Sequence, residues 1–175
     1  MESKQIMSRM RGFAVLVLCA SLVLGGCASK VPTKSEVIEV GWLQRSVFEK
    51  PELHQFVANY DTVKVDQDLA GMIRNVNTGV DFLVFLGTWC SDSRREVPHF
   101  LKIADECGID TSRIRLYGLD RSKKSVEGIS EKYHIERVPT FIFLKNGDEV
   151  GRITEKPTGT LEADVLSILA AAQKK

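Results

Sequence analysis

A continuous apolar run at residues 82–86 (Phe-Leu-Val-Phe-Leu) is the feature that most restricts how this chain can fold. It has the length and composition of a strand buried on both faces. A few residues later, within 91–106, the spacing changes to that of one helix face, with apolar residues three, one and three positions apart: Val97, Phe100, Leu101 and Ala104. A buried strand that leads into an amphipathic helix indicates an α/β domain.

The chain beyond this unit continues the alternation of strands and helices. We expect strands at 114–119, 140–144 and 149–153, and helices at 65–75, 126–133 and about 160–172. The pair Asn146-Gly147 between the last two strands predicts a hairpin turn. This order predicts a central mixed sheet with helices on both faces, closed by an antiparallel hairpin.

Residues 36–50 fit two patterns. Apolar side chains recur at helical spacing at Val37, Val40, Leu43 and Val47. Strand-like alternation is equally present, at Ile38, Val40 and Trp42. Helix and strand therefore both remain open for this segment.

Composition excludes several classes of protein. With 43% hydrophobic and 27% charged residues among 175, the chain is neither intrinsically disordered nor fibrous. Because 24 Lys and Arg face 23 Asp and Glu, the net charge of +1 gives no reason to expect a nucleic-acid partner. Four cysteines are too few for a disulfide-stapled scaffold.

The N-terminus has the layout of a secretory signal. Basic residues at positions 4, 9 and 11 precede an apolar run at 13–24. Twelve helical residues span ~18 Å, short of the ~30 Å hydrocarbon core of a bilayer. The run ends in Leu24-Gly25-Gly26-Cys27, which resembles the lipobox of bacterial lipoproteins. That resemblance implies cleavage before Cys27 and its acylation, whereas an ordinary secretory peptide with an incidental Cys27 is the alternative.

A cysteine stands where the first buried strand passes into its helix. Cys90 follows Gly87-Thr88-Trp89 and comes directly before the helix at 91–106. Unpaired N–H groups and the helix dipole favour an anion at this position, so a thiolate should be stabilised there. The carboxyl end of a strand is also where α/β folds place their sites. We therefore expect Cys90 to be a nucleophile rather than an inert buried thiol.

Two landmarks resemble the thioredoxin family. Residues 89–93 (Trp-Cys-Ser-Asp-Ser) are similar to its Trp-Cys-x-x-Cys site, and Pro98 matches the proline of its active-site helix. Residues 137–140 (Arg-Val-Pro-Thr) are similar to its cis-proline loop. The resemblance covers roughly residues 60–172. It implies a thioredoxin-like fold in which the loop lies beside Cys90, with substrate-binding residues at Trp89, Val138, Pro139 and Thr140.

Two positions depart from the family pattern. Ser93 replaces the second cysteine, and Val84 stands where a buried acid is usual. Without a resolving thiol, Cys90 can form a mixed disulfide but cannot release it by closing an internal bond. We therefore expect single-thiol exchange with thiol or disulfide substrates and an external thiol reductant. Ser93 is expected to assist by donating a hydrogen bond to the Cys90 thiolate. The alternative is a non-catalytic binding or chaperone-like module.

Other chemistry-bearing residues have weaker signals. Cys107 lies about 25 Å along the helix from Cys90, too far for a disulfide, and is expected to pack near the helix end. The histidines are scattered and show no zinc spacing, so we expect neither metal nor cofactor. Asp120 lies at a strand end, where a capping role is favoured over a place at the edge of the site.

These patterns divide the chain into three parts. Residues 1–26 are expected to be a lipoprotein signal peptide, 27–50 a lipid-attached tether with an N-terminal extension, and 51–175 the thioredoxin-like domain. The predicted location is the bacterial cell envelope, outside the cytoplasm, with the chain held on the membrane through Cys27. Because Ala28 rather than an acidic residue follows Cys27, the sorting pattern resembles that for the outer membrane of a Gram-negative host.

Overall fold

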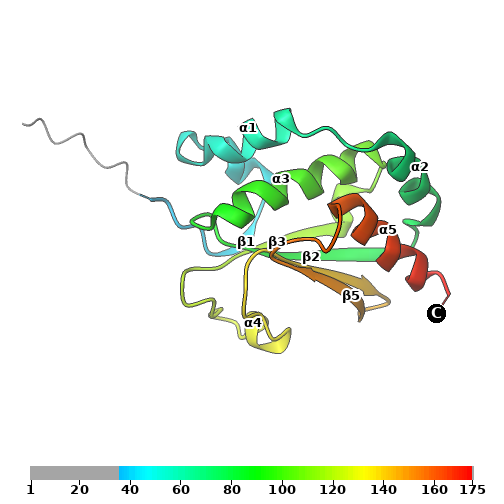
Figure 1. Ribbon diagram of the computed structural model, residues 1–175. Helices are drawn as coiled ribbons and strands as arrows, with labels where there is room; N and C mark the ends of the chain where they lie inside the picture. The colour runs from blue at the N-terminus through cyan, green and yellow to red at the C-terminus, as the bar shows by residue number, and fades with distance from the viewer. Residues whose placement is uncertain (1–35, 175) are drawn as a thin grey trace, which may run out of the picture. The chain divides into compact units, whose positions relative to one another are not determined.

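A five-stranded mixed sheet forms the centre of the computed structural model, which describes residues 36–174 (Figure 1). The strands are β1 (Gly41–Leu43), β2 (Val80–Leu86), β3 (Ile114–Gly118), β4 (Thr140–Lys145) and β5 (Asp148–Thr154). They are arranged in the order β1-β3-β2-β4-β5, where β2 and β3 are parallel and every other pair is antiparallel. The predicted mixed sheet with its closing hairpin is confirmed.

Helices cover the sheet unequally. The α-helices are α1 (His54–Thr62), α2 (Gln67–Val76), α3 (Ser91–Glu106), α4 (Ile129–Lys132) and α5 (Leu161–Ala172). Figure 1 shows α1, α2, α3 and α5 on one face of the sheet and the short α4 on the other. Helices therefore lie on both faces, as predicted, but most of the helical mass is on one.

The central strand β2 explains why its sequence is apolar without alternation. Phe82 and Val84 pack into the core beneath the four larger helices. Leu83 and Phe85 point the other way, into a second core that also holds Tyr117 of β3. Because both faces of β2 are covered, every residue from 82 to 86 is buried.

Two elements differ from the sequence prediction. The helix expected at 126–133 is reduced to the four residues of α4, because Gly128 adopts a left-handed conformation (φ 69°) directly before it. Helix α1 was not expected at all. Phe56 is its one fully buried side chain, so the sequence carries little helical periodicity there.

Residues 36–50 combine the two patterns that their sequence allows. Gly41–Leu43 forms β1 and pairs antiparallel with β3, whereas Arg45–Glu49 forms a 3₁₀ helix that buries Phe48 in the larger core. The last part of the segment assigned to the extension at 27–50 therefore contributes an edge strand to the sheet. The predicted signal peptide at 1–26 and the predicted lipidation site Cys27 lie outside the described residues. In the part that is described, no helix has the length and apolar character needed to span a membrane.

Candidate active site

Cys90 occupies the junction between the central strand and the longest helix. Strand β2 ends at Leu86, and Cys90 is the residue immediately before α3. Its N–H donates to the carbonyl of Gly87 (2.9 Å), and its own carbonyl accepts from the N–H of Arg94 (3.0 Å). These bonds close a tight turn that holds a half-buried thiol at the amino end of the helix. The predicted placement of Cys90 is confirmed.

The loop before β4 lies directly against this thiol. The Val138-Pro139 peptide bond is cis, as the resemblance to the family's cis-proline loop implies. The Cys90 Sγ atom donates to the Val138 carbonyl oxygen at 3.2 Å. Val138, Pro139 and Thr140 are buried, and the Thr140 hydroxyl donates to the Arg137 carbonyl (2.7 Å) inside the loop. The loop therefore meets the thiol through the backbone of Val138, and Thr140 shapes the loop from within.

Ser93 has a different partner from the expected one. Its side chain is fully buried one turn into α3, and its Oγ atom accepts the N–H of Gly87 at 3.1 Å. Among the hydrogen bonds of residues 36–174, none joins Ser93 to Cys90. Ser93 thus connects the first turn of α3 to the end of β2 and fixes the loop that carries the thiol.

Trp89 forms one wall of the loop. Its indole N–H donates to the Leu119 carbonyl at 2.8 Å, and the Arg121 guanidinium lies 4.8 Å from the ring centroid. The indole also packs tightly on Gly87, where an added Cβ would lie 2.7 Å from the ring. A side chain at position 87 would therefore displace Trp89 from its place beside Cys90.

Comparison with known proteins agrees with this geometry. A family model described as thioredoxin matches residues 48–167, more than half of the 175-residue chain. The chain belongs to the thioredoxin family. Over 91 residues it is 31% identical to a thioredoxin of Malassezia sympodialis, an alignment that covers 50% of this chain and 83% of the relative. Over 88 residues it is 26% identical to an H-type thioredoxin of Picea mariana, covering 50% of this chain and 66% of the relative.

A solved structure shows the same fold. A protein of unknown function from Pseudomonas aeruginosa superposes with a TM-score of 0.54 at 15% identity, covering 70% of this chain and 86% of that one. Family membership supports a thiol–disulfide oxidoreductase-like role, with thiol or disulfide proteins as substrates.

Three further residues of the described chain support the site, although no motif points to them. They are Glu36 and Thr88, which lie before Cys90, and Arg94, which lies after it. Arg94 Nε donates to the Thr88 carbonyl at 2.8 Å, and Asn59 of α1 donates to the Arg94 carbonyl at 2.6 Å. The Asn59–Arg94 contact joins segments that are 35 residues apart, so local sequence patterns could not reveal it.

The remaining candidate residues make no described hydrogen bond to the Cys90 thiol. Cys107 is buried at the far end of α3, as expected, where its Sγ atom donates to the Ala70 carbonyl (3.6 Å) and burial raises the pKa of its thiol. His99 hydrogen-bonds Glu162 of α5 at 3.0 Å. The Asp120 carboxylate accepts from Ser122 (2.9 Å to the N–H), which is a turn-capping role. Within residues 36–174, no three His, Cys, Asp or Glu side chains form a metal-binding group.

Proposed function

We propose that this protein exchanges thiols and disulfides through the single reactive thiol of Cys90. The observation that carries the proposal is the position of the sulfur. It is half-buried at the amino end of α3 and lies 3.2 Å from the Val138 carbonyl of the cis-proline loop. A half-buried thiol that lies beside the backbone of the cis-proline loop is suited to meeting an extended disulfide-bearing chain.

The proposed reaction has two balanced steps. The Cys90 thiol first loses its proton to solvent, and the thiolate attacks one sulfur of a substrate disulfide. A bond forms between Cys90 and that sulfur, and the other sulfur leaves as a thiolate. An external thiolate then attacks the mixed disulfide, forms a disulfide with the substrate sulfur and releases Cys90 as a thiolate. The net result is exchange of disulfide partners, and the external thiol supplies the electrons when the substrate is reduced.

Ser93 defines the single-thiol character of this mechanism. It occupies the position of the family's second cysteine, and its oxygen is engaged with the Gly87 N–H rather than with the sulfur. A mixed disulfide on Cys90 therefore persists until an outside thiol arrives. This favours isomerisation, mixed-disulfide resolution or thiol-assisted reduction over rapid dithiol reduction.

The location in the proposal follows from the N-terminal sequence. Acylation of Cys27 after removal of residues 1–26 attaches the domain to a membrane outside the cytoplasm. Bacterial cells that express the chain should incorporate labelled fatty acid into it, and the variant Cys27→Ala should incorporate none. Equal labelling of both forms contradicts the anchor without affecting the proposal for Cys90.

The decisive test of the exchange function is the variant Cys90→Ala in the full chain. Native protein should form a disulfide-linked adduct with a model protein whose disulfides have been reduced and then re-oxidised. An added thiol should release the model protein from that adduct. Cys90→Ala should reduce adduct formation at least about 100-fold, because the attacking sulfur is gone. The matched control Cys107→Ala should form the adduct at the native rate. If Cys90→Ala keeps full activity, the protein is a binding module and the exchange proposal fails.

The variant Ser93→Cys tests the single-thiol mechanism itself. A thiol at position 93 lies one turn from Cys90 and can attack the mixed disulfide from within the protein. We expect substrate release that no longer requires an external thiol, together with an oxidised form in which residues 90 and 93 are joined. Gel analysis after acid quenching measures both. Continued dependence on external thiol would show that release is not limited by the missing cysteine.

A further inference from the structure

The chain at residues 36–39 crosses the loop that carries Cys90. Thr88, two residues before Cys90, is fully buried, and its hydroxyl has two partners in this segment. Its Oγ1 atom donates to the Val37 carbonyl at 2.8 Å and accepts the Glu39 N–H at 3.1 Å. One side chain in the loop thus satisfies two backbone groups of the crossing segment.

Glu36 makes the second connection to the loop. One carboxylate oxygen lies 2.6 Å from Arg121 Nη2, and the other lies 3.6 Å from Arg94 Nη2. Arg121 lies over the ring of Trp89, whereas Arg94 holds the Thr88 carbonyl. Glu36 is therefore linked to both of the residues that immediately precede Cys90.

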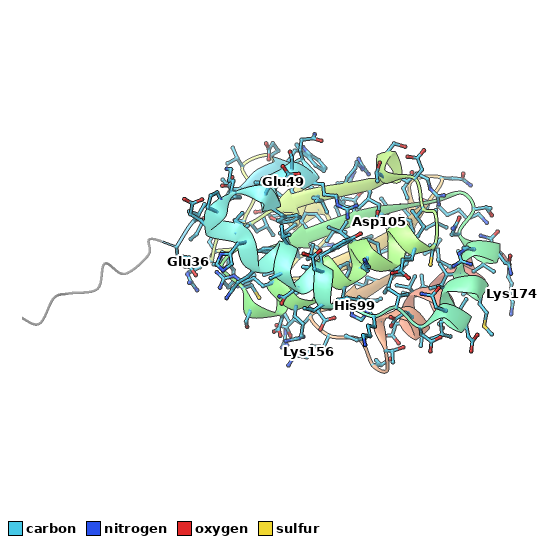
Figure 2. All side chains as sticks on the ribbon, turned by 90° about the horizontal axis from the view of Figure 1, so that it is seen from above. Glu36, Glu49, His99, Asp105, Lys156 and Lys174 are labelled. Atoms are coloured by element: carbon cyan, nitrogen blue, oxygen red, sulfur yellow. The ribbon has the colours of Figure 1, made fainter. Side chains whose placement is uncertain are left out.

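The crossing segment is seated closely on the sheet. At Gly118, the last residue of β3, an added Cβ would lie 2.3 Å from the Glu39 carbonyl oxygen. The backbone at Glu39 therefore lies directly on the end of β3, at the same edge of the sheet as the Cys90 loop. Figure 2 shows Glu36 at the side of the domain that is far from Asp105, which lies in the last turn of α3.

We propose that residues 36–39 form a clasp that fixes the geometry of the Cys90 loop, with Thr88 and Glu36 as positioning residues for disulfide exchange. Neither side chain contacts the sulfur. They act by holding residues 88 and 89 in one arrangement, so that the thiolate and the incoming disulfide meet in the productive orientation. The inference rests on the proposed exchange function of Cys90 and extends it to the N-terminal segment, which the family match from residue 48 does not cover.

Thr88→Val and Thr88→Ser together test the hydroxyl. Valine keeps the shape of the side chain but removes both hydrogen bonds, whereas serine keeps both. In the full chain, the rate constant for reaction of Cys90 with neutral bis(2-hydroxyethyl) disulfide should fall about tenfold in Thr88→Val. Thr88→Ser should stay within about twofold of the native rate. Equal losses in the two variants, or no loss in Thr88→Val with its fold intact by circular dichroism, overturn the proposal.

Glu36→Gln tests the ionic half of the clasp, with Lys50→Gln as a matched control. Lys50 pairs with Glu39 of the same segment at 2.5 Å, and its described contacts do not reach the loop. Glu36→Gln should slow the same reaction about threefold to tenfold, and Lys50→Gln should leave it within twofold. If the two variants behave alike, the effect belongs to the segment's general stability and the clasp is rejected.

A spectroscopic measurement separates failure of the clasp from failure of the exchange proposal. The chain has two tryptophans, so Trp89 is the only one left in a Trp42→Phe background. Loss of Glu36 frees Arg121 from its position over Trp89, and the emission of Trp89 should change in Glu36→Gln but not in Lys50→Gln. This signal does not depend on exchange. It supports the clasp when it shifts and overturns it when it does not, even if native Cys90 proves unreactive.

Discussion

The two ends of helix α3 each carry a cysteine, and the two thiols have opposite surroundings. Cys90 precedes the first turn, is half-buried and reaches the backbone of the cis-proline loop. Cys107 follows the last turn, is 2% exposed and donates to a backbone carbonyl of α2. Burial raises the pKa of the Cys107 thiol, which disfavours the reactive thiolate. The same residue type is thus half-buried beside a loop at one end of α3 and packed in the core at the other.

Polar contacts reinforce this division of the helix. At the far end, Asp105 accepts two hydrogen bonds from Arg45 (2.8 and 2.5 Å) and one from the Tyr60 hydroxyl (2.6 Å). These bonds attach the last turn of α3 to the 3₁₀ helix and to α1. At the near end, the contacts of Ser93 and Arg94 converge on the loop that carries the sulfur. Helix α3 is therefore anchored at its carboxyl end, and its amino end presents the thiol.

The largest expected difference between the two ends is in the rate of alkylation. In native protein, iodoacetamide should modify Cys90 at least about 100-fold faster than Cys107, because modification of a buried thiol requires local opening of the structure. Peptide mass spectrometry after timed quenching assigns each site despite the other cysteines in the chain. In concentrated denaturant the two rates should converge. Similar alkylation rates in the native state would show that burial does not distinguish the two thiols.

The amino end of α3 is the part of the site that the sequence predicts well. The apolar run at 82–86 and the helix spacing after it are local signals, and they correctly place Cys90 directly before α3. The contact between Cys90 and Val138 was implied by the resemblance to the thioredoxin family. The helix predicted at 91–106 matches Ser91–Glu106. Local periodicity was sufficient here because each element buries a continuous apolar face.

Local sequence patterns could not predict the contacts that support the Cys90 loop. Ser93 was expected to bond the Cys90 thiolate, but its oxygen accepts the Gly87 N–H, which depends on how α3 docks against β2. Thr88 meets Val37 and Glu39 only because a three-residue edge strand brings residues 36–39 to the end of β3. A strand this short has too few residues to show a period, and its pairing is settled by tertiary packing.

Cys107, the less reactive of the two cysteines, should contribute more than Cys90 to the free energy of unfolding. Cys107→Ala removes a buried sulfur and leaves a small cavity between α2 and α3, so we expect it to destabilise the protein by about 1 kcal/mol. Cys90→Ala removes a half-exposed thiol and should change the free energy of unfolding by less than about 0.5 kcal/mol. Urea titrations followed by circular dichroism compare the two directly. A larger loss for Cys90→Ala would mean that the thiol at the amino end also supports the fold.

The smallest expected effect concerns pH at the anchored end of α3. Burial acts to raise the pKa of Asp105, but hydrogen bonds from Arg45 and Tyr60 outweigh it, and the net pKa lies below the ordinary value of 3.8. A carboxyl whose pKa is lowered by folding stabilises the native state above its unfolded pKa, and that contribution is lost as pH falls through the lower folded pKa. Asp105→Asn should therefore cost about 0.5–1 kcal/mol at pH 7, with the gap to native protein closing as the pH falls below the ordinary value of 3.8. Asp61→Asn, which changes an exposed carboxylate of α1, serves as the control and should leave the free energy of unfolding at pH 7 nearly unchanged. A gap for Asp105→Asn that stays constant from pH 7 to pH 2.5 would show that shape rather than charge anchors this end of the helix.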